Sequence, residues 1–191
     1  MALLSKNYDV TALGELLVDF TERGVSDRGN VLFEANAGGA PCNLLAMLAK
    51  LGRRTAFLGK AGDDAFGRML CRRAADVGID VSGVRYDSCI PTTLAVVHNL
   101  PDGDREFSFY RSPGADLMLR PEEVDIEKIA SSRIFHFGTL STTADPARSA
   151  TYAAVECAKQ SGCIISFDPN LRLNLWPNSE SAKEQIAYGL S

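Results

Sequence analysis

Short apolar runs alternate along the chain with segments in which apolar residues recur at helical spacing. Continuous apolar runs bounded by turn residues are typical of strands buried on both faces, and the segments between them are typical of amphipathic helices. This alternation predicts an α/β fold built on a parallel sheet with helices on both faces. The predicted strands are residues 8–14, 55–59, 133–138 and 163–167, and the main predicted helices are residues 44–51, 65–77 and 146–160.

Single residues mark where two of these helices begin and end. Asp64 stands where a side chain can cap the helix that follows, and Gly78 stands where that helix should end. In the helix before it, Leu44, Leu48 and Leu51 recur at helical spacing. We expect these three leucines to form the stripe that packs on the sheet.

Two segments, residues 16–36 and 91–111, depart from this alternation of strands and helices. Apolar and polar residues alternate in them without an intervening helix. The middle of the second segment contains proline, aspartate and glycine, which favours a turn between antiparallel strands. After that turn, Phe107, Phe109 and Arg111 share one face. We predict a small inserted β-sheet that acts as a lid or a dimer surface. The plainer interpretation is a small half-buried sheet edge, which is compatible with a lid.

Composition narrows the class of protein. The chain has 191 residues, 46% hydrophobic and 23% charged, with a formal net charge of -4, which is typical of one globular domain. This charge, without a Lys/Arg-rich run, argues against nucleic-acid or membrane partners. The 5 cysteines are scattered and lack a C-x-x-C pair, and the 2 histidines are too few for a metal cluster. We therefore expect no metal ligands in this chain. Scattered cysteines are typical of reduced thiols, and together with the lack of a signal peptide they predict a cytoplasmic protein.

Residues 37–43, Ala-Gly-Gly-Ala-Pro-Cys-Asn, lead straight into the first predicted helix. Gly38 and Gly39 allow a ligand to approach the backbone closely, and Pro41 suits the first helical turn. The free N–H groups of that turn, at the positive end of the helix dipole, would face a polar ligand. Asn43 adds a donor and an acceptor, which suits a sugar hydroxyl. A tight strand-to-helix turn with no ligand is the alternative.

Polar side chains follow several of the predicted strands. Asp19 comes soon after the first strand, and residues 168–172, Asp-Pro-Asn-Leu-Arg, follow the last. Because ligands of an open parallel sheet bind at the carboxyl ends of its strands, these groups should meet at one edge. Asp19 can accept hydrogen bonds from hydroxyl groups, and Arg111 can reach in from the lid. The alternatives are a turn residue for Asp19 and a surface ion pair for Arg172.

A set of segments in a fixed order carries a resemblance to a known family. Over essentially its whole length the chain resembles the ribokinase-like (pfkB) carbohydrate kinases, and among them the fructokinases. The resemblance implies a three-layer sandwich with a mostly parallel central sheet and an inserted lid, with residues 1–191 forming the N-terminal portion of one domain. The segments are GELLVDF (14–20), GGAPCN (38–43), GKAGDDAFG (59–67), DREFSFYR (104–111) and FDPNLR (167–172).

The same resemblance implies a phosphoryl transfer from ATP, with Mg²⁺, to a sugar hydroxyl, which in fructokinases is the 6-hydroxyl of fructose. It implies a small-molecule sugar and ATP as the partners, and it suggests a homodimer through the lid. Asn170 and Arg172 match positions near the path of the phosphoryl group. The positions that match sugar-binding residues are Asp19, Gly38, Gly39, Asn43 and Arg111.

Two elements of the family are absent from the sequence. One is a late Gly-Ala-Gly-Asp motif, whose aspartate takes the proton from the sugar hydroxyl, and the other is an Asn-x-x-Glu element associated with magnesium and phosphate. Residues 61–64, Ala-Gly-Asp-Asp, resemble the first superficially, but they follow an early strand, so capping and packing better explain Asp63 and Asp64. We therefore expect a chain that stops before the catalytic part. The catalytic base would lie beyond Ser191, and the chain alone would show little kinase turnover.

Three interpretations remain open. The favoured one is a fructokinase-like kinase of which this chain forms the sugar-binding half. The second keeps the family and changes the acceptor to ribose, a nucleoside or 2-keto-3-deoxygluconate. The third is a sugar-binding module without catalysis. A Rossmann dehydrogenase is disfavoured because no G-x-G-x-x-G follows the first strand.

Overall fold

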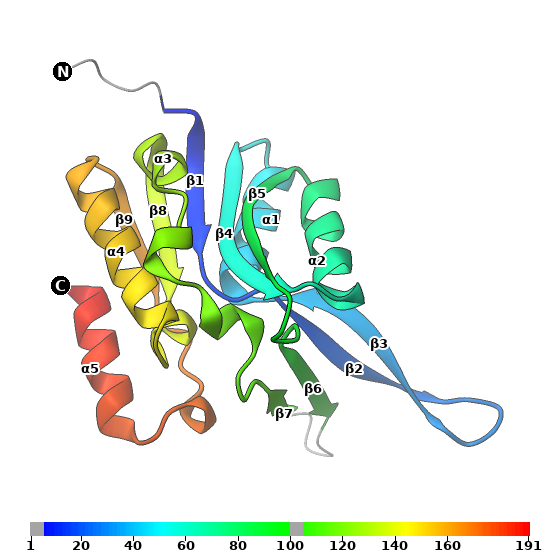
Figure 1. The fold of residues 1–191 in the computed structure, drawn as a ribbon. Helices are drawn as coiled ribbons and strands as arrows, with labels where there is room; N and C mark the ends of the chain where they lie inside the picture. The colour runs from blue at the N-terminus through cyan, green and yellow to red at the C-terminus, as the bar shows by residue number, and fades with distance from the viewer. Residues whose placement is uncertain (1–5, 100–104) are drawn as a thin grey trace.

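A parallel sheet forms the centre of the molecule, in a computed structural model that describes residues 6–99 and 105–191 (Figure 1). Its 5 strands lie in the order β5-β4-β1-β8-β9, and every neighbouring pair is parallel. The sequence predicted all of them except β5, so the predicted parallel α/β sheet is confirmed. The strands are β1 (Tyr8–Leu13), β4 (Thr55–Gly62), β5 (Ile79–Asp87), β8 (Ser132–Gly138) and β9 (Ile164–Asp168).

Helices cover both faces of this sheet and give three layers (Figure 1). On one face, α1 (Ala40–Lys50) and α2 (Ala65–Asp76) pack on one apolar cluster, which includes Phe57 of β4. On the other face, α3 (Ile126–Ala130) and α4 (Ala147–Gln160) pack on a second cluster around Phe135 and Phe137 of β8. The remaining helical elements are η1 (Ala115–Met118), η2 (Pro121–Glu123), η3 (Thr139–Thr142), η4 (Leu173–Leu175) and α5 (Ser179–Leu190).

A second, smaller sheet lies at the carboxyl end of β1 and extends away from the three layers (Figure 1). Its strand order is β3-β2-β6-β7, with antiparallel outer pairs and a parallel central pair, so it is a mixed sheet. The turn predicted between its last two strands lies outside the described residues. The strands are β2 (Leu17–Val25), β3 (Val31–Gly38), β6 (Leu94–Asn99) and β7 (Arg105–Tyr110).

The buried face of α1 differs from the predicted one. Leu45 is completely buried, whereas Leu44 and Leu51 are 37% and 68% exposed. The predicted stripe was therefore wrong for Leu44 and Leu51, whereas Leu48 is partly buried and packs on the core as predicted. The helix starts at Ala40, earlier than expected, and Pro41 and Cys42 begin its buried face. Because most residues of this segment are apolar, spacing alone did not select the buried face.

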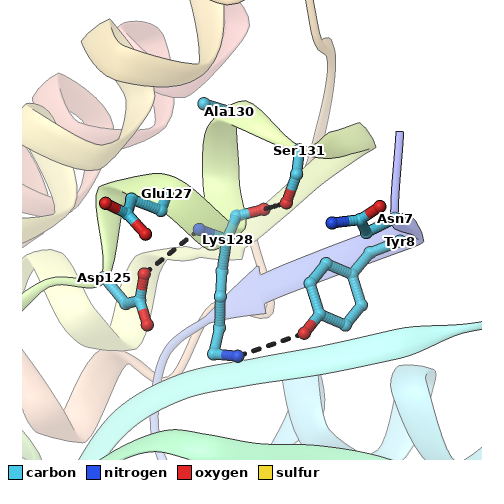
Figure 2. Close-up of a pocket in the computed structure, with 7 residues that line it drawn as sticks. All are labelled: Asn7, Tyr8, Asp125, Glu127, Lys128, Ala130 and Ser131. Carbon is cyan, nitrogen blue, oxygen red and sulfur yellow. Dashed lines mark hydrogen bonds between the residues drawn. The ribbon is translucent and has the colours of Figure 1, made fainter. Parts of the chain in front are cut away.

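At the amino-terminal end of β1, a cluster of charged and polar side chains ties three elements together. Lys128 of α3 donates from Nζ to the hydroxyl of Tyr8, at 3.1 Å, and to Asp80 Oδ2 of β5, at 2.7 Å. The Tyr8 hydroxyl donates to the same Asp80 oxygen. Figure 2 shows Lys128 and Tyr8 in the wall of an open pocket of about 590 Å³. These groups satisfy one another, so we assign the cluster to stability and not to ligand binding.

Candidate functional site

A cleft of about 200 Å³ opens at the carboxyl ends of the central strands, beside the second sheet. Its walls come from segments that are far apart in the sequence, as expected for a ligand site in an open parallel sheet. Most of the predicted site residues line it, while Gly38 and Arg111 do not. The lining residues are Glu15, Leu17, Asp19, Gly39, Ala40, Asn43, Phe107, Phe109, Leu140, Asn170 and Arg172.

The paired glycines shape the floor of this cleft. Gly39 has φ 114° and ψ 117°, a conformation that side chains disfavour, and a Cβ there would collide with the carbonyl oxygen of Glu15. A Cβ on Gly38 would lie 2.8 Å from Asp19 Cγ, closer than carbon atoms normally approach. The backbone N–H of Ala40 then donates to Glu15 Oε1, at 2.7 Å. Gly38 therefore leaves room for the side chain of Asp19, and Gly39 leaves room for the backbone of Glu15.

Asp19 and Asn43 offer polar groups to a ligand. Within the described part of the chain, neither side chain forms a hydrogen bond. Burial raises the pKa of Asp19, and the positive charge of Arg172 opposes that rise. A half-buried carboxyl acceptor beside an amide that can donate and accept is suited to a ligand with several hydroxyl groups. Direct contact of either residue with a ligand stays a prediction.

Aromatic rings and a guanidinium form the opposite wall. Phe107 and Phe109 of β7 stack with their ring centres 6.1 Å apart, and the Arg172 guanidinium lies 5.7 Å from the centre of the Phe107 ring. Asn170 adopts φ 37°, a left-handed conformation that asparagine tolerates better than most residues. Its backbone N–H donates to Asp168 Oδ1, at 3.0 Å. This turn holds Asn170 and Arg172 at the cleft.

Arg111 lies beneath the cleft, not in its lining, so the structure differs here from the predicted reach of Arg111 out of the lid. Its Nε and Nη2 donate to Asp116 Oδ2, at 2.8 and 2.5 Å. Its remaining hydrogen bonds go to Thr143 Oγ1 and to the carbonyl oxygen of Leu140. The ion pair joins two side chains that are 3% and 2% exposed. A buried guanidinium requires such partners. Direct contact of Arg111 with a ligand stays a prediction, because the guanidinium is already hydrogen-bonded to protein groups.

Glu15 is the ionisable residue of the cleft that sequence reasoning did not assign. It is 2% exposed, yet the residue lines the cleft. The pKa of Glu15 is raised to about 7, mainly by burial and to a lesser degree by the charge of Asp116. Hydrogen bonds from the backbone N–H groups of Glu15 and Ala40, and the charge of Arg111, oppose this rise. The available signal was an acidic residue inside the apolar run Gly-Glu-Leu-Leu-Val, because burying an acid is costly and an acid in such a run needs a reason.

The described residues do not provide a metal site. Within residues 6–99 and 105–191, no three side chains of His, Cys, Asp or Glu gather closely enough to hold an ion. We therefore assign no Mg²⁺ ligand to the described residues. In the same described ranges, no helix has the length and apolar character needed to cross a bilayer.

Asp63 and Asp64, which the sequence assigned to capping and packing and not to catalysis, lie outside the cleft. Asp64 caps α2 and also accepts hydrogen bonds from Thr92, while Asp63 pairs with Arg68 on the surface. Their partners agree with the structural roles predicted for them. That the catalytic base lies beyond Ser191, the last residue of the chain, stays a prediction.

The fold and the cleft together define an α/β protein with a polar cleft at the carboxyl edge of its sheet. Residues 7–191 match the pfkB family of carbohydrate kinases, and the chain belongs to that family. The matched range contains every residue of the cleft. The predicted family membership is thus confirmed.

Named relatives agree with this assignment. The chain is 45% identical over 179 residues to probable fructokinase-4 of Arabidopsis thaliana, and 46% identical over 179 residues to fructokinase-1 of Zea mays. Each alignment covers 93% of this chain and 55% of the relative. The chain therefore spans about half the length of the curated relatives that it matches.

Solved structures show the same ribokinase-like fold. A fructokinase from Xylella fastidiosa superposes with a TM-score of 0.89 at 35% identity, covering 96% of this chain and 57% of that chain. A putative ribokinase II from E. coli superposes with a TM-score of 0.85 at 26% identity, covering 96% of this chain and 60% of that chain. The predicted fold class is confirmed by these similarities.

Proposed function

We propose that the cleft binds a hexose, D-fructose, and that this chain is the sugar-binding part of an ATP-dependent fructokinase. The observation that carries the proposal is the meeting of Asp19 and Asn43 in one cleft, from two separate elements, without hydrogen-bond partners in the described part of the chain. The fructokinase names of relatives at about 45% identity support fructose as the sugar.

The chemistry of the cleft suits a polyol. Each sugar hydroxyl can donate one hydrogen bond and accept others, which matches a carboxylate acceptor at Asp19 and an amide at Asn43. The apolar edges of a sugar ring would pack against Phe107 and Phe109, which line the same cleft. Two acidic residues, Glu15 and Asp19, and a single basic residue, Arg172, line it, so a neutral ligand fits it better than a polyanion.

In the complete enzyme, the role of these residues would be to position and protect the acceptor. Phosphoryl transfer depends mainly on holding the reacting oxygen in line and on excluding water. Asp19 and Asn43 would hold the sugar so that its 6-hydroxyl points out of the cleft, and the second sheet would act as a lid over it. A fructokinase structure with bound ATP, similar to this chain with a TM-score of 0.87, supports ATP as the donor.

Isothermal titration of the purified chain with D-fructose tests this proposal. We expect Asp19→Asn and Asn43→Ala to weaken fructose binding about 10-fold or more, because each removes a hydrogen bond to a desolvated ligand. Asp63→Asn is the matched control, because Asp63 is exposed and outside the cleft. The proposal is wrong if the wild-type chain binds no sugar, or if the control weakens binding as much as Asp19→Asn does.

The same titration ranks the acceptors. Fructose, ribose, a nucleoside and 2-keto-3-deoxygluconate would be compared at one pH and one temperature. We expect fructose to bind most tightly. Tighter binding of one of the other three compounds would show that the substrate is not fructose, while the assignment to the kinase family would stand.

We also propose that the second sheet forms a homodimer. Several apolar side chains of its β2–β3 hairpin are exposed: Val25 by 67%, Val31 by 51%, Leu32 by 46% and Phe33 by 44%. The hairpin extends away from the rest of the molecule (Figure 1), where a second copy can reach it. Light scattering during size-exclusion chromatography should give a dimer mass, and Phe33→Asp should give a monomer. A monomeric wild-type chain contradicts this part of the proposal.

A cytoplasmic location is proposed on the basis of the thiols. All 5 cysteines are free, and Cys42 and Cys71 are buried side chains without a disulfide. Free thiols are typical of a reducing compartment. Fractionation of cells that express the tagged protein would test the location.

A further inference from the structure

Glu15 lies at the floor of the proposed sugar cleft, in the segment between β1 and β2. Glu15 lines the cleft and also a smaller adjoining pocket, which shares Ala40, Leu140 and Asn170 with the cleft, although Glu15 is 2% exposed. One of its oxygens, Oε1, accepts the N–H of Ala40 at the start of α1, at 2.7 Å. A proton on this carboxyl would therefore be carried by the other oxygen, Oε2, because Oε1 is already an acceptor.

The charges around Glu15 leave it without a counter-ion of its own. Arg111 is the buried cation nearby, and its Nη2 already donates to Asp116, at 2.5 Å. Arg172 interacts with Asp19 across the cleft, and burial lowers the pKa of His136. The titratable and charged side chains that face Glu15 or share its two pockets are Asp116, Arg111, Cys42, Asp19, Arg172, His136 and Asp168.

One buried cation beside two buried carboxyls cannot neutralise both. The pair of Arg111 and Asp116 has the better geometry, with two donors on one oxygen. Glu15 then carries the cost of burial, which raises its pKa to about 7. At neutral pH, much of the protein therefore holds Glu15 as a neutral acid.

We propose that Glu15 binds the sugar as a neutral carboxylic acid, donating a hydrogen bond from Oε2 to a sugar oxygen, and that its ionisation weakens sugar binding. The inference rests on the proposed function, because it names a further contact of the same cleft. It complements Asp19, which accepts hydrogen bonds when ionised, by adding a donor on the floor. A sugar hydroxyl needs both kinds of partner to lose no hydrogen bond on leaving water.

Titration of the chain with D-fructose at several pH values from 5.5 to 8.5 tests the proposal. A carboxyl with a pKa near 7 is mostly protonated at about pH 6 and mostly ionised at about pH 8, so we expect about 10-fold weaker binding at pH 8. In Glu15→Gln, the side-chain amide donates at every pH, so binding should lose this pH dependence. Glu15→Met keeps the size and removes the donor, so its binding should be weak throughout.

Two further measurements complete the test. Glu127→Gln is the matched control, because Glu127 lies on α3 in the pocket of Figure 2, away from the cleft, and it should keep the wild-type pH profile. Carbon NMR of the labelled glutamate carboxyls in the wild-type chain should show one that titrates near pH 7 and whose pKa rises when fructose is added. This measurement needs no variant to fold.

The outcomes separate the two proposals. If the wild-type chain binds no fructose at any pH, the proposed function fails and this inference fails with it. If fructose binds equally at pH 6 and pH 8, the inference alone is overturned. It is likewise overturned if Glu15→Gln retains the wild-type pH dependence, or if no glutamate carboxyl responds to fructose.

Discussion

The carboxylate of Asp19 lies where the side chain of residue 38 would be if Gly38 had one. A Cβ built on Gly38 approaches Asp19 Cγ to 2.8 Å, and it also lies 3.0 Å from Leu17 Cδ1. The two residues are on neighbouring antiparallel strands, where Leu17 pairs with Gly38 and Asp19 pairs with Asn36. Gly38 thus keeps the floor open for the acid beside it without lining the cleft itself.

Gly38→Ala should therefore weaken fructose binding by displacing Asp19, even though alanine removes no polar group. We expect a loss of about 10-fold, similar to that of Asp19→Ala, since a displaced carboxylate gives up the same charged hydrogen bond. A double-mutant cycle measured by calorimetric titration checks the cause. In the Asp19→Ala background, Gly38→Ala should have little further effect, and additive losses would show that the glycine acts in another way.

Arg111 should be essential for stability because its removal leaves a buried carboxylate unpaired. Asp116 is 5% exposed and forms its ion pair with Arg111. We expect Arg111→Met to lower the free energy of unfolding by about 3–5 kcal/mol. Urea denaturation measures this change. Adding Asp116→Leu should restore part of the loss, and a loss below about 1 kcal/mol in the single variant would contradict the prediction.

Glu15 should make the folded state less stable as the pH rises towards neutrality. Its pKa is about 7 in the folded chain, against a reference value of 4.5. Below the pKa of Glu15 in the unfolded chain, the carboxyl is neutral in both states, and its burial carries no cost from charge. The free energy of unfolding then falls as the pH rises from that value through the pKa of Glu15 in the folded chain. Glu15→Gln should therefore gain about 3 kcal/mol relative to wild type between pH 4.5 and pH 8. Urea denaturation across this range checks it, and parallel profiles for the two proteins would refute it.

Asp80 should have the opposite dependence, in the acid range. Burial acts to raise the pKa of Asp80, but hydrogen bonds from Lys128, Tyr8 and Ser82 outweigh it and hold the pKa well below 3.8. Its contribution to stability is present above the unfolded pKa and is lost as the pH falls through the folded value. Asp80→Asn should cost about 1–2 kcal/mol at pH 7, and the difference should shrink below about pH 3.

Thermal or urea unfolding at pH 7 and pH 2.5 would measure this change. Asp76→Asn is the control, because Asp76 is an exposed aspartate at the end of α2. It should leave stability nearly unchanged at both pH values. A difference for Asp80→Asn that does not depend on pH would assign the effect to packing and not to charge.

The sequence pattern predicted those strands and helix ends that depend on residues close together in the chain. The runs at β1, β4 and β8 are apolar because both faces of a central parallel strand are buried. The run at β9 is also apolar, although β9 lies at the edge of the sheet and is only partly buried. Asp64 caps α2 by accepting the N–H of Gly67, as its place before the helix indicated. These features depend on neighbours within a few residues, so the sequence displays them directly.

Features that depend on distant contacts were missed or misplaced. β5 was not predicted, because this strand at the edge of the sheet mixes buried and exposed positions without a regular period and contains Gly83. The buried face of α1 was assigned to Leu44 instead of Leu45. In a helix with apolar residues on most sides, the sheet that it covers decides which face is buried.

The sequence by itself determined the α/β layering, the glycine turn before α1 and the family, because strand, helix and turn signals lie within short stretches of chain. The tertiary structure decided which polar groups share the cleft. Glu15 lies on its floor and Arg111 lies beneath it, paired with Asp116. The choice of partner for a buried charge depends on which strands and turns become neighbours, and on the cost of leaving that charge unpaired. No local pattern contains that information.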